Sequence, residues 1–416
     1  MIKKIIFSLL FLIVSINLVH ASTTPMAKIG NEYFDTLEEA IKSANSDDVI
    51  TLVSDISLDE TLLIDKVINL NLNGNNITAP NKVFMVKGGT LNVSGKGTIK
   101  EENPNYGAIY VVGSNTKTGD KYSVVNIEKD VTLEGWSGVF ITHENYKSYG
   151  VSVNVDGKIN ALDDVNGDTG VGIYVNGNIK EKTESPVINI TDNALINSTG
   201  PGLYIAGYST FNIGDAKITG VESGIAIKSG ILNIDGASIT CTGVDKTPTT
   251  GFNNGVKPSG ATIQIESNSG YAGGIELNIS NGNFVSKNSN VVYEYIGKGN
   301  SSLIYSMSFS NGTFVSQAGK NVFSFSDSFK DIHSGFISGG KYSSDPSEYL
   351  KSGYSVSKQD NLYTVIKSSM KIVNSNNFSE NNSNSVLKTI IIFVSIILIG
   401  IVAYLKKDKL YNLIKR

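Results

Sequence analysis

Apolar and polar residues alternate over stretches of only three to five residues, and these stretches return at a fixed interval through the middle of the chain. The copies that begin at Gly202 and Gly224 place Ile213 against Ile234, 21 residues apart, and an earlier copy places Ile190 in the same role. A strand of this length cannot close a core alone, but it can bury its apolar side against the next copy. The pattern predicts an array of short, stacked strands.

The same alternation separates an apolar side of the predicted strands from a polar side. Within residues 68–73, three aliphatic residues alternate with three asparagines, and a glycine followed by alternating apolar residues recurs, as in GIYV from Gly172 and GLYI from Gly202. We interpret these glycines as points where the backbone turns between successive sheets. A β-propeller needs blades of roughly 40 to 50 residues, so the shorter interval favours an all-β, right-handed parallel β-helix.

Different patterns bound the array at its two ends. Residues 29–34 predict a first short strand, and the segment DTLEEAIKSA predicts an amphipathic helix in which Thr36 and Glu39 fit a capping box. A helix at the open end of stacked strands covers apolar surface and blocks edge-to-edge association. We therefore expect an N-terminal cap over residues 29–48 and a terminal element over residues 335–367.

Two longer apolar segments predict export and membrane anchoring. Residues 1–21 combine two lysines, an uncharged apolar run and small residues before a cleavage point, as a signal peptide does. Residues 386–405 predict a transmembrane helix, and the five positive charges of residues 406–416 predict a short basic cytoplasmic tail. The Asn- and Ser-rich residues 368–385 predict a tether. Residues 22–367 then form an ectodomain outside the cell, held at the cell membrane by a single pass.

The charge of the exported part limits the classes of partner that it can bind, and its cysteine content limits its disulfides. The chain carries a formal net charge of −3, its first 21 residues carry two lysines, and the residues from Lys388 onward carry six positive charges and one aspartate. The remainder therefore carries about −10 and contains no arginine for bidentate recognition of phosphate. We expect no nucleic-acid partner. The single cysteine, Cys241, excludes intramolecular disulfides and is interpreted as a small core residue.

An acidic loop in the segment ALDDVNGDTG is the main candidate for chemistry. Asp163, Asp164 and Asp168 could supply acid and base for glycoside hydrolysis, although a solvated corner loop is the simpler interpretation. Asp164, Asn166 and Asp168 also alternate as oxygen ligands do in a calcium loop, with Thr169 where such loops place glycine. These three residues carry a hypothesis of Ca²⁺ binding, no other cofactor is expected, and no catalytic residue is assigned.

Tyrosines are the main candidates for binding, because their amphipathic rings suit both sugars and protein partners. A possible stripe along stacked copies comprises Tyr106, Tyr110, Tyr146, Tyr149, Tyr174, Tyr204 and Tyr208. Three of these, Tyr110, Tyr174 and Tyr204, follow apolar positions in predicted strands, so they can also simply cover a sheet face. The residues predicted to bind a ligand are Tyr146, Tyr149, Tyr174, Tyr204 and Tyr208.

Both ends of the array also resemble a known family. The segment YFDTLEEAIKSANSDDVITLVSDISLDETLLIDKVINLNLNGNNIT resembles the opening of pectate-lyase-like β-helix surface proteins of low-GC Gram-positive bacteria, and GKYSSDPSEYLKSGYSVSKQDNLYTVI resembles the element that ends their arrays. The resemblance implies a β-helix at the cell surface more firmly than it implies an activity. No LPxTG-like sorting signal precedes the final apolar segment, so the membrane helix is the expected anchor.

These observations lead to three hypotheses about function. The first is a membrane-anchored cell-surface β-helix that acts as an adhesin or binding module for an extracellular glycan or protein ligand. The second is a carbohydrate-active enzyme, either a polysaccharide lyase or a glycoside hydrolase, because β-helix folds host both. The third is a passive stalk or coat element. A cluster of carboxylates in one groove would favour hydrolysis, whereas an aromatic lateral face without such a cluster would favour binding.

Overall fold

The computed structural model describes residues 24–368 apart from residues 144, 146, 178, 180, 249–257, 272 and 327–332. The chain divides into two units, Met1–Lys367 and Ser368–Arg416. The predicted signal peptide, membrane span and tail, and all but the first residue of the predicted tether, lie outside the described residues. Within the part of the chain that is described, no helix has the length and apolar character needed to cross a bilayer.

The first unit begins with a hairpin. Strand β1 (Ala27–Ile29) pairs antiparallel with β2 (Glu32–Phe34) and with the strand that follows the first helix. The prediction of one strand over residues 29–34 was therefore wrong. Gly30 adopts a φ of 57°, which residues with a side chain rarely adopt, and it turns the chain at this point.

A short helix, α2 (Leu37–Ser43), follows the hairpin as predicted. The hydroxyl oxygen of Thr36 accepts a hydrogen bond of 3.2 Å from the backbone N–H of Glu39, which is the N-terminal half of a capping box. Leu37, Ala40 and Ile41 are buried in the main hydrophobic core. The helix thus contributes its apolar side to the array, while its function as a cap stays a prediction.

Three rows of parallel strands make up most of the unit, and each strand pairs with its counterparts in the copies before and after it. The first row contains β3 (Val49–Leu52), β6 (Val67–Asn71), β9 (Thr90–Ser94), β12 (Ser123–Ile127), β15 (Val151–Val155), β18 (Val187–Ile190), β21 (Thr210–Ile213), β24 (Gly230–Cys241), β26 (Ile275–Ser286) and β28 (Ile304–Phe309). The second row contains β4 (Ile56–Ser57), β7 (Ile77–Ala79), β10 (Gly97–Glu101), β13 (Val131–Gly135), β16 (Lys158–Ala161), β19 (Leu195–Ser198), β22 (Lys217–Gly220), β24 and β26 again, β29 (Thr313–Ser316) and β31 (Lys341–Tyr342). The third row contains β5 (Leu62–Ile64), β8 (Phe84–Val86), β11 (Ile109–Val112), β14 (Ser137–Thr142), β17 (Val171–Val175), β20 (Pro201–Ile205), β23 (Ser223–Ile227), β25 (Ile263–Ser267), β27 (Val292–Ile296) and β30 (Phe323–Ser324).

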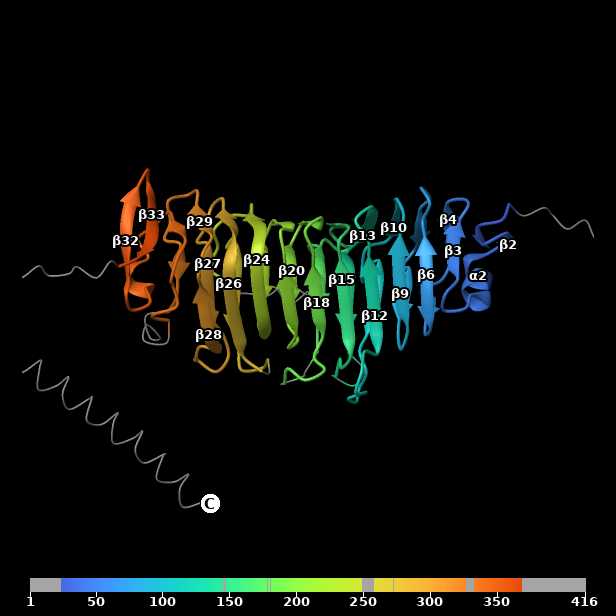
Figure 1. Cartoon of the computed structure of the whole chain (residues 1–416), viewed down its shortest axis with the longest axis horizontal. Coiled ribbons are helices and arrows are strands. Elements are labelled where there is room, and N and C mark those ends of the chain that lie inside the picture. Colours follow the sequence, from blue (N-terminus) through green and yellow to red (C-terminus); the bar gives the residue numbers. More distant parts are fainter. Residues whose placement is uncertain are drawn as a thin grey trace, which may run out of the picture. The chain divides into compact units, whose positions relative to one another are not determined.

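The rows form two parallel sheets. The long strands β24 and β26 pair in both the first and the second row, so these rows belong to one 23-stranded sheet, whereas the third row is a separate 10-stranded sheet. The strands of the first unit follow one another in chain order, as the change of colour from blue to orange shows (Figure 1). The protein is therefore an all-β chain with long parallel sheets, an architecture compatible with a β-helix.

Strand register confirms the alignment of the sequence copies. Ile213 pairs with Ile234, and Ile190 of the earlier copy pairs with Ile213. Successive residues of a strand point to opposite sides of a sheet, so this register stacks aliphatic side chains on one side. The three isoleucines are at most 3 % exposed and belong to one continuous core.

Two glycines of the recurring motif, Gly172 and Gly202, have a different role from the predicted one. Neither Gly172 nor Gly202 adopts a positive φ. A Cβ atom on Gly172 would lie 2.4 Å from Cγ2 of Ile196, and a Cβ atom on Gly202 would lie 2.4 Å from Cγ2 of Ile218. Glycine is thus needed here because the second row packs too closely for any side chain, not because the backbone must turn.

Aromatic side chains fill the interior of the last copies. Phe284, Phe314 and Tyr342 are fully buried and stack with ring centroids 4.7 and 4.9 Å apart. The chain ends the array with a 3₁₀ turn, η2 (Ser347–Tyr349), and an antiparallel hairpin of β32 (Tyr354–Gln359) and β33 (Leu362–Lys367), in which β33 also pairs with β31. These elements occupy the predicted terminal element.

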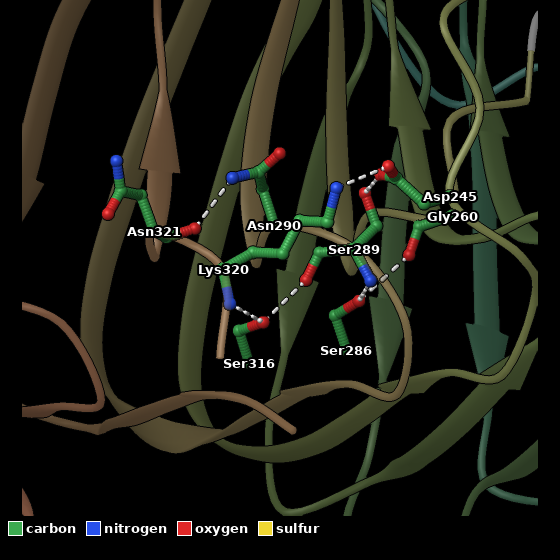
Figure 2. Close-up of polar contacts among 8 residues, drawn as sticks. All are labelled: Asp245, Gly260, Ser286, Ser289, Asn290, Ser316, Lys320 and Asn321. Atoms are coloured by element: carbon green, nitrogen blue, oxygen red, sulfur yellow. Dashed lines mark hydrogen bonds and ion pairs between the residues drawn. The ribbon is translucent and has the colours of Figure 1, made fainter. Parts of the chain in front are cut away.

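A polar network holds the last copies together where the second row passes into the third (Figure 2). The carboxylate of Asp245 accepts a hydrogen bond of 2.6 Å from the hydroxyl of Ser289 and lies 2.6 Å from the ammonium of Lys320. The hydroxyl of Ser286 accepts the N–H of Ser289 and donates to the carbonyl oxygen of Gly260, both at 2.9 Å. Buried polar groups at this corner are thereby satisfied by their neighbours.

An asparagine ladder runs along the outer side of the first row. Each member donates a side-chain hydrogen bond of 2.6 to 2.9 Å to the carboxamide oxygen of the member before it. The ladder comprises Asn69, Asn92, Asn126, Asn154, Asn189, Asn212, Asn233 and Asn278. The spacing between neighbouring strands suits such bonds because identical carboxamides lie directly above one another.

Candidate functional site

The third row carries a ladder of aromatic side chains on the side that faces away from the core. Strand pairing places Tyr110, Phe140, Tyr174 and Tyr204 in register. Successive ring centroids are 5.0, 4.5 and 4.8 Å apart. The neighbours of these residues along each strand are aliphatic and point into the core, as Ile109 does with no exposed surface. We call these four residues the aromatic ladder.

The rings of the ladder stack face to face on one another. The planes of Tyr110 and Phe140 differ by 20°, and those of Phe140 and Tyr174 by 17°, so these pairs are stacked. At the N-terminal end, Tyr106 contacts Tyr110 edge to face, and the ammonium of Lys82 lies 4.3 Å from the centroid of the Tyr106 ring. Ring edges and phenol hydroxyls, rather than open ring faces, are therefore the groups that the ladder offers to a ligand.

The last ring of the aromatic ladder is more buried than the rings before it. Tyr106 is 39 % exposed, whereas Tyr204 is 1 % exposed. Trp136 packs beside Phe140 and Tyr174 with centroids 6.0 and 5.6 Å away. Burial raises the pKa of both the Tyr174 and the Tyr204 hydroxyl well above the usual value. The last ring is therefore closed to a partner, the other three rings are partly exposed, and Tyr106 beside the first ring is the most open.

A buried ion pair lies beyond the last ring. The ammonium of Lys228 is 3.0 Å from a carboxylate oxygen of Glu266, and the side chains are 4 % and 3 % exposed. The ammonium also donates a hydrogen bond of 3.2 Å to the hydroxyl of Tyr271 and lies 4.7 and 5.2 Å from the ring centroids of Tyr271 and Tyr204. A charge pair this far from water costs desolvation energy, so its presence outside the core requires these close partners.

The structure brings together only part of the predicted tyrosine set. Tyr174 and Tyr204 belong to the aromatic ladder, whereas Tyr146 lies outside the described residues. Tyr149 is 8 % exposed, and its hydroxyl contacts Glu181 at 3.3 Å. Tyr208 is 7 % exposed and follows the end of β20. Neither Tyr149 nor Tyr208 continues the ladder, and ligand binding by the set stays a prediction.

Sequence reasoning missed Phe140 and Trp136 in the aromatic side and the whole Lys228–Glu266 pair. Phe140 could have been found, because GVFI repeats the motif of GIYV and GLYI with phenylalanine at the aromatic position. No signal in the sequence pairs Lys228 with Glu266, because an insertion of irregular length separates β24 from β25 between the two residues.

The acidic loop is organised by the side chain of Asp164. One of its carboxylate oxygens accepts the backbone N–H groups of Asn166 and Asp168 at 2.8 and 2.7 Å. Among the described residues, no group of three or more His, Cys, Asp or Glu side chains is placed to hold a metal ion. Ca²⁺ binding by Asp164, Asn166 and Asp168 stays a prediction. In the structure, the side chain of Asp164 stabilises the local turn.

A groove of about 320 Å³ near this loop contains a carboxyl group that the sequence did not suggest. Glu222 lines it together with Thr169 and Lys246. The pKa of Glu222 is raised to about 7, mainly by burial and in part by the negative charges of Asp163 and Asp168. The hydrogen bond with Thr169 and the positive charge of Lys246 act in the opposite direction. A carboxyl group with such a pKa can act as a general acid near neutral pH.

Burial has the same effect on the only cysteine. It raises the pKa of the Cys241 thiol to about 11, and the side chain is fully buried. This agrees with the interpretation of Cys241 as a core residue.

Comparison of the chain with protein-family models, with curated proteins and with solved structures finds no match. The assignment of a function therefore rests on the residues and their geometry.

Proposed function

We propose that this protein is a right-handed parallel β-helix displayed on a bacterial cell by a C-terminal membrane helix, where it binds an extracellular glycan or protein ligand. The observation that carries the proposal is the aromatic ladder on the outer side of the third row. Stacked rings on this side are not needed to fill the interior, which aliphatic side chains already occupy. Tyrosine supplies contact area and a hydroxyl at little cost in side-chain entropy, as binding surfaces require.

The open end of the aromatic ladder is the proposed contact region. Tyr106 and Tyr110 present ring edges and hydroxyls there, and Lys82 adds a positive charge over both rings at 4.3 and 5.1 Å. Such groups suit carbonyl, hydroxyl or carboxylate oxygens of a ligand better than they suit the flat face of a sugar. A protein or an acidic glycan therefore fits this end better than a neutral glycan does.

Retention of ligands by the purified protein tests the proposal. A panel of matrix proteins and of acidic and neutral glycans is presented to the wild type and to the double variant Tyr106→Ala/Tyr110→Ala. We expect the loss of about 2 kcal/mol or more of binding free energy that is typical of a hot spot. Tyr33→Ala is the matched control, because Tyr33 is 59 % exposed and lies in the N-terminal hairpin. If the folded double variant retained ligands as well as the wild type does, the open end of the aromatic ladder would not be the binding region.

A second candidate function, glycoside hydrolysis, is favoured by one observation, the carboxyl group of Glu222 with its pKa of about 7 in a groove near Asp163 and Asp168. In this hypothesis Glu222 donates a proton to the leaving oxygen, and one of the aspartates is the second carboxylate. The test is product release from a panel of polysaccharides, with Glu222→Gln as the inactive variant. The control is Glu134→Gln, because Glu134 of β13 pairs with Lys100 and does not line the groove. Retention of a glycan without any product release would contradict hydrolysis.

A further inference from the structure

Lys228 and Asn268 each contact the carboxylate of Glu266 at the covered end of the aromatic ladder, an arrangement that suits a covalent reaction between them. The pairing of Ile227 with Ile265 places Lys228, which follows β23, opposite Glu266 of β25. The ammonium of Lys228 lies 3.0 Å from Oε2 of Glu266. The carboxamide of Asn268 donates a hydrogen bond of 3.1 Å to Oε1 of the same carboxylate. One carboxylate thus holds an amine and a carboxamide on its two oxygens.

The surroundings of the amine and the carboxylate exclude water. Lys228 and Glu266 are 4 % and 3 % exposed, and the rings of Tyr204 and Tyr271 lie against the ammonium. A proton that passes from Nζ to the carboxylate stays within this pair, because neither group is open to solvent. The amine that this transfer leaves is a nucleophile.

The carboxamide is also held in a polarised state. Oδ1 of Asn268 accepts the backbone N–H of Gly270 at 2.9 Å. This N–H points at the oxygen on which negative charge would develop if an amine attacked Cγ of Asn268. The carboxylate of Glu266 meanwhile contacts Nδ2, which is the nitrogen that would leave.

We propose that Lys228 and Asn268 form an intramolecular isopeptide bond, with Glu266 as the group that transfers the protons. The ammonium of Lys228 first gives a proton to Glu266, and the lone pair of Nζ then attacks Cγ of Asn268. The bond from Nζ to Cγ forms while the bond from Cγ to Nδ2 breaks. Two of the three protons of the original ammonium end on the leaving nitrogen and on Glu266, and the third stays on the new amide nitrogen. The products are one secondary amide and one molecule of ammonia, and no oxidant, metal or other reactant takes part.

The bond would join two copies of the array across an interruption. Lys228 follows β23 and Asn268 follows β25, and the insertion after β24 lies between them. Nζ must leave the hydroxyl of Tyr271 and move onto Cγ for the bond to form. A covalent link at this place restrains the unfolded chain and keeps the adjacent copies together under load, as other cross-links do.

The mass of the purified full-length wild type tests the proposal directly. We expect the denatured protein to be lighter than its processed sequence by one ammonia, and a tryptic digest to contain a branched peptide that joins Lys228 to Asn268. Lys228→Met, Asn268→Ala and Glu266→Gln should each have the full mass, and Glu266→Gln should do so although both reacting residues remain. Lys320→Met is the matched control and should still lose ammonia, because Lys320 pairs with Asp245 at the surface.

Two results would overturn the proposal. The first is a wild-type protein of unmodified mass with Lys228 and Asn268 in separate peptides. The second is the loss of one ammonia with Lys228 still in a linear peptide, which would indicate a cyclic imide at Asn268. Both results come from the wild type, so they hold even if a variant fails to fold.

Discussion

The outer sides of the first and the third row carry two ladders that differ in chemistry and in continuity. The asparagine ladder comprises eight stacked side chains joined by seven hydrogen bonds, from Asn69 to Asn278. The aromatic ladder comprises four rings and stops where Ala226 takes the place of a ring in the next strand. The first spans nearly the whole array, whereas the second is confined to four copies.

This difference separates a structural ladder from a candidate site. In the asparagine ladder each carboxamide donates to a neighbour, so most of its hydrogen-bonding capacity is used within the protein. The aromatic ladder is flanked by a buried ion pair at one end and by the exposed Tyr106 at the other, two features that repetition does not require. Regular stacking therefore indicates stability, and the positions where stacking stops are where function is best sought.

The largest effect is expected from breaking the ion pair at the end of the aromatic ladder. In an Asn268→Ala background, where no cross-link can form, Lys228→Met leaves the carboxylate of Glu266 buried without its ammonium partner. We expect a loss of about 3 to 5 kcal/mol in the free energy of unfolding relative to Asn268→Ala alone. Lys320→Met, in the exposed pair with Asp245, should cost only about 0 to 1 kcal/mol. Denaturant unfolding of both variants measures the contrast. Equal losses in the free energy of unfolding would mean that the buried ion pair contributes no more to stability than the exposed one.

A smaller effect is expected from opening the aromatic ladder in its middle. Tyr174→Ala removes a ring that is stacked on Phe140 and contacts Tyr204 and Trp136. Because the side chain is partly exposed, we expect a loss of about 2 to 4 kcal/mol, below the range for a fully buried ring. Tyr174→Phe keeps the ring and should unfold close to the wild type. A similar loss in both variants would show that the hydroxyl, rather than the stacking, holds this position.

The asparagine ladder should respond less than the aromatic ladder to removal of one member. Asn154→Ala removes the hydrogen bonds to Asn126 and from Asn189, and we expect a loss of about 1 to 2 kcal/mol in the free energy of unfolding. Asn154→Asp keeps the size but replaces the donor with a charged acceptor facing the oxygen of Asn126, so it should cost more than alanine at pH 7. An aspartate variant as stable as the wild type would contradict the contribution of these hydrogen bonds to stability.

The last effect is expected at the corner groove, which belongs to neither ladder, and it depends on pH. Folding raises the pKa of Glu222 from an ordinary carboxyl value to about 7, so the folded state binds the proton more tightly than the unfolded state does. Glu222 therefore favours folding at low pH, and this contribution is lost as pH rises from about 4.5 to about 7. We expect Glu222→Gln to gain stability relative to the wild type as pH rises from 5 to 8. A stability difference that does not change with pH would refute the raised pKa.

Much of the array could be predicted from the sequence because the repeat acts locally. The interval of 21 residues fixed the pairing of Ile213 with Ile234, and Thr36 with Glu39 fixed the start of the helix. The hairpin at Gly30 and the packing role of Gly202 were missed, because a turn and a close contact of one residue leave the periodic pattern unchanged.

The sequence by itself determined that this protein is built from short stacked strands, which strands pair, and which side of each strand faces the core. These properties follow from alternation and period, since a shift of one residue would expose every apolar side chain. Only the tertiary structure decided that Lys228, Glu266 and Asn268 meet, and that Glu222 lies near the acidic loop. Those contacts join copies across insertions of irregular length, and the sequence pattern does not constrain where an insertion brings its ends together.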